Sequence, residues 1–422
     1  MPRYASTLLA TLFASLILFA GFNTVVDPFG ITGAPDIPGL TGRDTRLLED
    51  GGRVHVADRL ARGEDRSIIL GSSRTVDGFP SEAENWPGGL YNAGMRGTNI
   101  FELTQAAALA AESPVLQCVV IGLDLDEFGT HSKAKATYWL SALTDGNRLF
   151  SLARVALSPN TFGASVQMIA DNLTGGEPRV PWADTYPAGA QRERYENGTR
   201  GIYRWYLGYN FDPERLALFE SLLDRLTANG VQVTGFIHPL HAWREEAMWR
   251  AGRGEDYLAF RAELAALFER HADREPVSAC TPGGSAVLWD FSGFQPFASQ
   301  PAPAADQTEA HPAFYEPSHY LPHVGADMLE RMRQVRDTGP FDLAPFGVRL
   351  TPQTAPASAD AIRDRRAAWQ QTEDGQAVTQ LLDAVIAGNP APEVSPPQFL
   401  NRDDRTSVSD KLDAIAPAAA RR

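Results

Sequence analysis

Two short motifs bring together the residue types of a serine nucleophile and its base. Gly71-Ser72-Ser73-Arg74 closes a short apolar run that begins at Ser67, and Glu316-Pro-Ser-His319 lies late in the chain. A serine hydroxyl becomes nucleophilic when a neighbouring base takes its proton, and a carboxylate orients that base. Glu316 and His319 are three residues apart, so in a helical or turn conformation their side chains point the same way.

Two further motifs are typical of sites that hold a negatively charged oxygen. Asn92-Ala-Gly94-Met-Arg-Gly97 has glycines that let backbone N–H groups approach a ligand just before a helix begins, which predicts an oxyanion donor. Gly122-Leu-Asp124-Leu-Asp126 ends another apolar run. In open α/β sheets, ligands bind outside the carboxyl ends of the strands, so we expect these motifs at one edge of a sheet.

The elements that would position these motifs alternate along the chain. Strands are predicted at 67–71, 90–92, 115–123, 231–237 and 286–290, and helices at 44–61, 99–111, 212–229, 256–271 and 322–335. Such alternation indicates βαβ crossovers and a parallel sheet with helices on both faces. The predicted class is therefore α/β.

The chain divides into four predicted parts. Residues 1–27 form an apolar anchor, 28–63 a Pro- and Gly-rich stalk with a leading helix, and 64–345 the α/β domain. Residues 129–211 break the alternation and are expected to form an insertion over the carboxyl edge of the sheet. Residues 346–422 are rich in Pro and Ala, which indicates a loosely ordered tail with one or two short helices.

The anchor has the length of a membrane helix. No charged side chain lies between Arg3 and Asp27, and about 20 apolar residues span a bilayer. A cleaved signal peptide is the alternative, but the run is long and has no clear A-x-A site. The positive-inside rule places the N-terminus in the cytoplasm and the main domain outside. The expected location is the inner membrane, single-pass, with a periplasmic domain.

Composition narrows the classes further. The chain has 422 residues, 43% of them apolar, and a net charge of −14, which argues against nucleic-acid binding. Its two cysteines, Cys118 and Cys280, lack metal-site spacing, and we expect neither metal nor cofactor. Two separate structural cysteines are favoured over a disulfide, because a sequence alone does not fix a pairing.

The four motifs, at Ser73, at Asn92 to Gly97, at Gly122 to Asp126 and at Glu316 to His319, follow one another along the chain as they do in the SGNH (GDSL-type) hydrolases and acyltransferases. The chain resembles this family over roughly residues 64 to 340. The anchor adds similarity to the membrane-tethered branch, which includes DltD-like and AlgJ/AlgX-like proteins and acts on cell-envelope polymers. The resemblance implies a three-layer α/β/α, flavodoxin-like domain preceded by one transmembrane helix.

By position, the resemblance implies that Ser73 is the nucleophile, with Ser72 as the runner-up. His319 would be the general base, and Glu316 would orient it. The backbone N–H groups of Ser73 and Gly94 would form the oxyanion hole, and Asp124 occupies the position of its third donor.

Two residues depart from the family pattern. Glu316 stands where the family usually has Asp. Asp124 stands where the family usually has an Asn that donates to the oxyanion. A carboxylate there would repel the developing charge unless it is protonated or turned away.

Five other residues are candidates for substrate binding: Arg74, Asn92, Arg96, His238 and His241. The two arginines could meet an anionic polymer or phosphate, or form ordinary surface ion pairs. For the two histidines, a polar loop role at the rim of the pocket is favoured over substrate contact. His323 could compete as the base, but it is expected inside the last helix.

An aromatic cluster lies in the predicted insertion, at Tyr203, Trp205, Tyr206 and Tyr209. Aromatic faces can pack on sugar rings, but buried packing is favoured, since aromatic side chains mostly supply buried area. Asp290, at the end of a predicted strand, is expected to cap a turn.

The resulting hypothesis is an extracytoplasmic serine esterase or O-acyltransferase acting on acyl esters of envelope glycans through an acyl-enzyme. Its partners would be an acyl-ester or glycan substrate and a membrane-bound acyl-donor protein. The alternative is a non-catalytic binding or assembly protein of the envelope polysaccharide machinery. Catalysis requires Ser73 Oγ within about 2.6–3.2 Å of a His319 ring nitrogen.

Overall fold

A computed structural model describes residues 2–41, 47–83, 85–130, 132–174, 185–343 and 346–388. Its centre is a seven-stranded sheet in the order β2-β3-β1-β4-β5-β6-β9. The five inner strands are parallel to one another: β1 (Ser67–Leu70), β3 (Leu90–Asn92), β4 (Cys118–Leu123), β5 (Gln232–Ile237) and β6 (Ala286–Asp290). The predicted α/β class and all five predicted strands are therefore confirmed.

The order of the parallel strands follows a known doubly wound pattern. Numbered along the chain, they lie in the order 2-1-3-4-5, which is the flavodoxin-like order. Each residue of β1, β4, β5 and β6 is buried, as expected for strands covered on both faces. The sequence did not predict the antiparallel edge strands β2 (Glu82–Ala83) and β9 (Val348–Arg349), because two residues carry no periodic signal.

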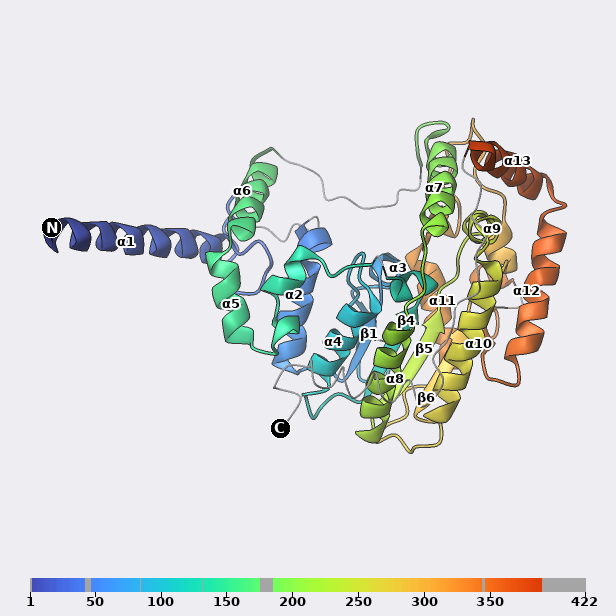
Figure 1. The fold of residues 1–422 in the computed structure, drawn as a ribbon, viewed down its shortest axis with the longest axis horizontal. Coiled ribbons are helices and arrows are strands. Elements are labelled where there is room, and N and C mark those ends of the chain that lie inside the picture. The colour runs from blue at the N-terminus through green and yellow to red at the C-terminus, as the bar shows by residue number, and fades with distance from the viewer. Residues whose placement is uncertain are drawn as a thin grey trace.

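Helices cover both faces of the sheet (Figure 1). On the near face lie α4 (Ile100–Ala110), α8 (Pro213–Ala228) and α10 (Gly254–Arg270). On the far face α3 (Ser73–Gly78) packs against α11 (Pro322–Met332). The N-terminal signals of α4 and α8 act as predicted, since Asn99 and Asp212 each accept a hydrogen bond from the first turn.

The predicted insertion at 129–211 divides into two parts that lie far apart (Figure 1). Short 3-10 turns at 136–140 and 142–144, α5 (Arg148–Leu157) and α6 (Pro159–Thr174) lie beside α1 (Pro2–Val26) and α2 (Leu47–Arg62). By contrast, α7 (Ala190–Leu207) packs against α9 (Ala242–Arg250). The prediction is wrong for α5 and α6, which pack on α1, whereas α7 and residues 132–135 lie near the carboxyl edge.

The predicted loose tail is wrong for residues 346–388. After β9, α12 (Ala355–Trp369) packs on α10, and α13 (Glu373–Gly388) packs on α7 and α9. Apolar side chains at helical spacing, such as Ile362, Val378 and Leu382, are fully buried. These buried apolar side chains, rather than the Pro and Ala content, determine that the segment folds as packed helices. Residues 389–422 lie outside the described residues, as do 42–46, where the predicted leading helix begins.

The N-terminal helix is long and apolar enough to cross a membrane. Its segment Arg3–Val26 has a mean hydropathy of 2.0, and 11% of the most apolar window is buried. Cys118 and Cys280 form a disulfide with their Cα atoms 6.4 Å apart, so the favoured interpretation of two separate cysteines is wrong. The two residues are 162 positions apart, and no local pattern relates them.

Candidate active site

The structure joins Ser73, His319 and Glu316 in one hydrogen-bonded chain. Ser73 is the first residue of α3, so the turn after β1 presents its hydroxyl at the carboxyl edge of the sheet. His319 Nε2 lies 2.7 Å from Ser73 Oγ, and His319 Nδ1 is bonded to Glu316 Oε1. The predicted contact is therefore confirmed, while the catalytic role stays a prediction.

A small hairpin positions the histidine. β7 (Phe314–Glu316) and β8 (His319–Tyr320) pair antiparallel, with Glu316 opposite His319 across a two-residue turn. Burial favours the neutral form of Glu316, but the bonded His319 and the nearby Arg244 outweigh burial and lower its pKa. A charged Glu316 accepts a hydrogen bond from Nδ1–H of His319, which leaves Nε2 free to accept the proton of Ser73.

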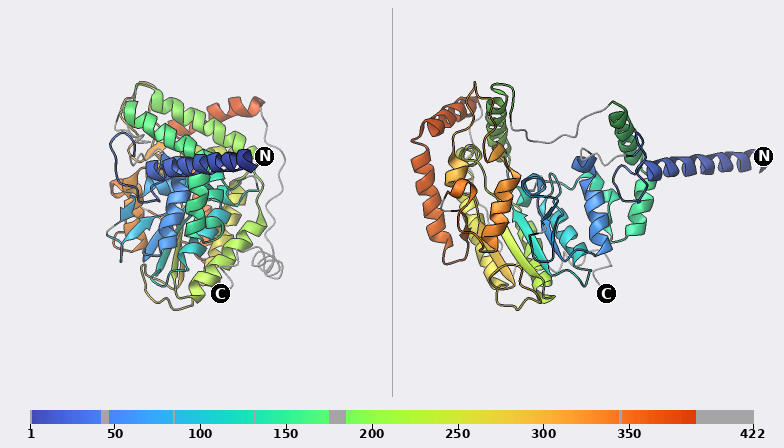
Figure 2. Two further views of the ribbon diagram at one scale, coloured as in Figure 1. Left: turned by 90° about the vertical axis from the view of Figure 1, so that its left-hand side faces the viewer. Right: turned by 180° about the vertical axis from the view of Figure 1, so that it is seen from behind.

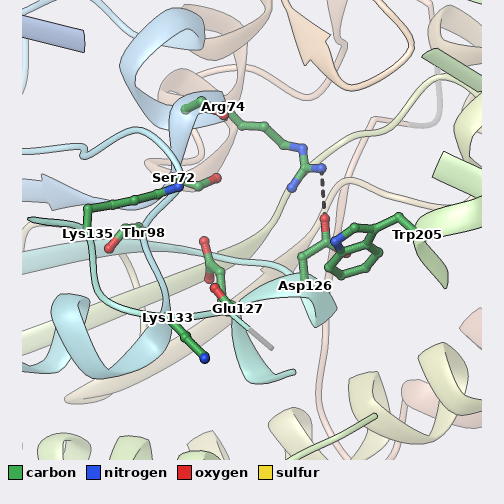
Figure 3. Close-up of a pocket in the computed structure, with 11 residues that line it drawn as sticks. Ser72, Arg74, Thr98, Asp126, Glu127, Lys133, Lys135 and Trp205 are labelled. Atoms are coloured by element: carbon green, nitrogen blue, oxygen red, sulfur yellow. Dashed lines mark hydrogen bonds and ion pairs between the residues drawn. The ribbon is translucent and has the colours of Figure 1, made fainter. Parts of the chain in front are cut away.

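Arg74 is not a free ligand for substrate, because three groups of the protein surround its buried guanidinium. It forms an ion pair with Asp124, lies 3.3 Å from Asp126 Oδ2, and donates from Nε to the Ser318 carbonyl at 3.0 Å. Figure 3 shows its contact with Asp126. The Ser318 carbonyl belongs to the hairpin turn, so Arg74 ties the residue before His319 to the nucleophile's helix.

The ion pair with Arg74 changes the role expected of Asp124. An ionised carboxylate only accepts hydrogen bonds, so a charged Asp124 has no proton to give to an oxyanion. Its Oδ2 also accepts a bond from Ser72 Oγ at 3.4 Å. Asp124 as an oxyanion donor is therefore wrong. An Asn here would leave the buried guanidinium with less compensating charge.

A second arginine repeats the arrangement from the other side. Arg244 donates to Ser318 Oγ at 2.8 Å and forms an ion pair with Asp126. Tyr206 of α7 donates to the other oxygen of Asp126 at 2.5 Å. Burial would raise the pKa of Asp126, but the two arginines lower it, so Asp126 stays charged. Sequence reasoning missed Arg244, and no sequence signal relates it to Asp126, which lies 118 positions away.

The predicted oxyanion donor at Gly94 is already engaged. Its N–H donates to Asn92 Oδ1 at 3.0 Å, while Asn92 Nδ2 donates to the carbonyls of Thr75 at 3.0 Å and Phe79 at 3.1 Å. Asn92 thus fixes the loop rather than facing a substrate. Among the described residues, the Ser73 N–H has no partner and stays available for an oxyanion.

The other predicted binding residues are also held by the protein. Arg96 forms a bidentate ion pair with Asp77. His238 is fully buried, with Nδ1 2.9 Å from Tyr320 Oη, and His241 is fully buried as the N-terminal cap of α9. Neither histidine lies on a pocket rim, so that interpretation is wrong.

His323 and the aromatic cluster are the last of the predicted candidates. His323 lies in the first turn of α11, as expected. Tyr203, Tyr206 and Tyr209 are buried, which confirms the packing interpretation for these three, while Trp205 is partly exposed.

A cleft of about 350 Å³ opens beside Ser73 (Figure 3). Trp205 lies on its wall, and both Lys133 and Lys135 line it. The two lysine side chains are exposed, and neither forms an ion pair with any residue that the structure describes. Sequence reasoning missed them, although the signal was present, because the chain has only three lysines among 38 basic residues.

Comparisons with known proteins do not assign the chain to a family. No family model matches the sequence, and no curated protein matches it. Within the described part of the chain, no group of three His, Cys, Asp or Glu side chains could hold a metal ion.

Replacing Asp124 with Asn tests whether this carboxylate balances Arg74. Both side chains are almost completely buried, and removing one partner of a buried pair costs about 3–5 kcal/mol. We expect Asp124→Asn to lower the free energy of unfolding by an amount near that range in denaturant titrations. The control is Asp145→Asn, whose pair with Arg154 is about one-third exposed, and which should cost at most about 1 kcal/mol. Unchanged stability with a more reactive serine would contradict the assignment.

The buried histidines predict that stability falls in mild acid. Burial lowers the pKa of His238 to about 4, although Asp124 opposes the shift, and burial lowers that of His311 to about 4 as well. Between pH 6.5 and 4 the unfolded chain binds protons that the folded chain does not. Each such ring therefore lowers the free energy of unfolding by about 1.4 kcal/mol per pH unit as pH falls.

The measurement is the free energy of unfolding in denaturant at pH 7, 6 and 5, for the wild type and His238→Asn. The slope against pH, rather than the absolute stability, is the readout. We expect a shallower slope in the variant, and equal slopes would show that His238 does not contribute.

Proposed function

We propose that this chain is a membrane-anchored, extracytoplasmic serine esterase or O-acyltransferase of the SGNH type. It would act on acyl esters of cell-envelope glycans through an acyl-enzyme. The observation that carries the proposal is the 2.7 Å contact between Ser73 Oγ and His319 Nε2, with Glu316 on the other ring nitrogen. A positioned serine, base and carboxylate are the parts that acyl transfer needs.

The proposed reaction has two halves. Ser73 Oγ attacks the ester carbonyl while His319 Nε2 takes its proton, and the charge on the carbonyl oxygen is met by the Ser73 N–H. His319 then gives the proton to the departing alkoxide, which leaves an acyl group on Ser73. Water or a glycan hydroxyl, deprotonated by His319, attacks this ester, and His319 returns the proton to Ser73 Oγ as the ester bond breaks. An esterase and an acyltransferase share the first half.

Two features support a location outside the cytoplasm. Arg3 precedes the apolar part of α1, which favours an N-terminus in the cytoplasm and a periplasmic main domain at the inner membrane. The disulfide between Cys118 and Cys280 favours an oxidising compartment, since such bonds are rare in reducing ones. A membrane-bound acyl-donor protein would be the natural partner of a transferase.

A non-catalytic binding or assembly role is the second candidate, and one observation favours it. The Gly94 N–H is bonded to Asn92, and Asp124 is paired with Arg74. Only the Ser73 N–H is then left of the three predicted oxyanion donors. Removing one such donor typically costs about 10²–10³ in rate, so a site with one donor would be slow.

A fluorophosphonate probe distinguishes the two candidates. On the full-length chain in detergent, we expect Ser73 to be labelled, Ser73→Ala to abolish labelling, and His319→Ala to slow it by about 10²-fold or more, because the base is lost. The control is Ser72→Ala, since Ser72 Oγ bonds to Asp124 rather than to a histidine. Absence of labelling in a folded wild-type chain would favour the non-catalytic role.

The unpaired charges at the cleft favour an anionic substrate. Of the two acidic residues that also line the cleft, Asp126 is paired with Arg74 and Arg244, and burial raises the pKa of Glu127. Arg74 and Arg96 are neutralised by aspartates, whereas Lys133 and Lys135 have no counter-ion among the described residues and line the cleft. Unpaired cations beside a cleft raise the local concentration of anions and the association rate, by about 10-fold or more. We therefore favour ester substrates that carry a carboxylate or phosphate near the scissile bond.

Replacing both lysines tests this preference. We expect Lys133→Gln/Lys135→Gln to lower kcat/KM about 10-fold for a carboxylate-bearing nitrophenyl ester and to leave a neutral nitrophenyl acetate almost unchanged. Arg274→Gln/Arg363→Gln removes the same charge on surfaces away from the cleft and should have little effect on either ester. Equal losses for both esters in the lysine variant would contradict an anion subsite.

A further inference from the structure

Two helices beside the anchor expose apolar faces to solvent. On α5, Leu149 is 73% exposed and Phe150 62%, and on α6, Leu173 is 75% exposed. Exposed apolar residues recur at helical spacing along both helices, at Leu149, Phe150, Ala153 and Leu157 on α5 and at Phe162, Val166, Ala170 and Leu173 on α6. In a chain of net charge −14, two such neighbouring apolar faces mark an interaction surface.

Charge is scarce on this surface. Asp171 is the one charged residue of α6. The two arginines of α5 are both paired, Arg148 with Asp58 and Arg154 with Asp145. The exposed faces of α5 and α6 are therefore uncharged as well as apolar.

Both helices are fixed to the end of the anchor. The buried side chain of Asn23, near the end of α1, donates to the carbonyl of Ala156 at 2.9 Å and accepts from Ser165 Oγ at 3.4 Å. Figures 1 and 2 show α5 and α6 flanking the end of α1 and running across its direction. A membrane that α1 crosses would thus meet these two helices side-on.

The length of α1 sets the depth at which they meet it. A bilayer core takes about 20 helical residues at about 1.5 Å each, so a span that begins after Arg3 ends near Asn23. Phe19 lies inside that span. The ring of Phe162 on α6 lies 5.3 Å from the rings of both Phe19 and Phe22. Phe162 must then share the depth of the last turns of the span.

We propose that the exposed faces of α5 and α6 lie in the surface of the outer leaflet, in the bilayer that α1 crosses. Interfacial helices immerse their apolar faces by about 5–10 Å, which agrees with the position of Phe162 beside Phe19. The occupant of these faces is lipid, and it adjoins the lipid around α1. The α/β domain is then held in one orientation instead of swinging on a tether.

Site-directed spin labelling of the full-length chain tests this surface. Single variants Phe150→Cys, Val166→Cys and Leu173→Cys carry a nitroxide in vesicles of phosphatidylethanolamine and phosphatidylglycerol. The native cysteines are joined in a disulfide, so the label reacts at the introduced thiol. Val277→Cys is the control, because Val277 is also apolar and is 81% exposed, at a site distant in sequence from both helices.

In lipid, the three labels should collide often with oxygen and rarely with a water-soluble nickel chelate, whereas the label at Val277 should show the reverse. A water-like pattern at all three sites would overturn the proposal. So would low access to both reagents, which would indicate a protein cover such as a second copy of the chain. Neither reading depends on Ser73 chemistry, so the result is independent of the proposed reaction.

Discussion

The buried guanidinium of Arg74 is the group on which the candidate site depends. A charge taken out of water must be compensated, and breaking such a pair is costly. Arg74 follows Ser73 directly and contacts Asp124 at the end of β4, Asp126 two residues later and the Ser318 carbonyl in the hairpin turn. One side chain therefore connects the nucleophile, the neighbouring strand and the segment that carries the base.

This connection explains how a two-strand hairpin can hold a histidine in place. β7 and β8 form a sheet of only two strands, which is marginally stable by itself. Arg74 fixes the turn through the Ser318 carbonyl, and Arg244 fixes it through the hydroxyl. The imidazole orientation is thus imposed by buried charges, and the cost of burying those charges is offset by Asp124 and Asp126.

Local chemistry could be predicted from the sequence, and long-range pairing could not. Periodicity and spacing reveal features that depend on a few neighbouring residues. These are the five parallel strands, the capping residues Asn99 and Asp212, and the spacing of Glu316 and His319. The pairing of Arg244 with Asp126 and the disulfide between the two cysteines each depend on how distant segments meet.

The candidate site contains one exception. The contact between Ser73 and His319 joins distant segments, yet the order of the motifs and the family resemblance predict it. The ion pair between Asp124 and Arg74 could not be predicted, because it depends on where the Arg74 side chain turns. The hydrogen bond from the Gly94 N–H to Asn92 Oδ1 is local, but a loop has no periodic pattern from which such a bond could be predicted.

The scarcity of lysine makes this cleft chemically distinct from the rest of the described surface. The chain has three lysines, and the two that the structure describes, Lys133 and Lys135, both border the space beside Ser73. A protease that cleaves only after lysine would therefore meet, in the described part of the chain, two bonds at the mouth of the cleft. Cleavage at those bonds would report on whether the cleft is filled, without any labelled substrate.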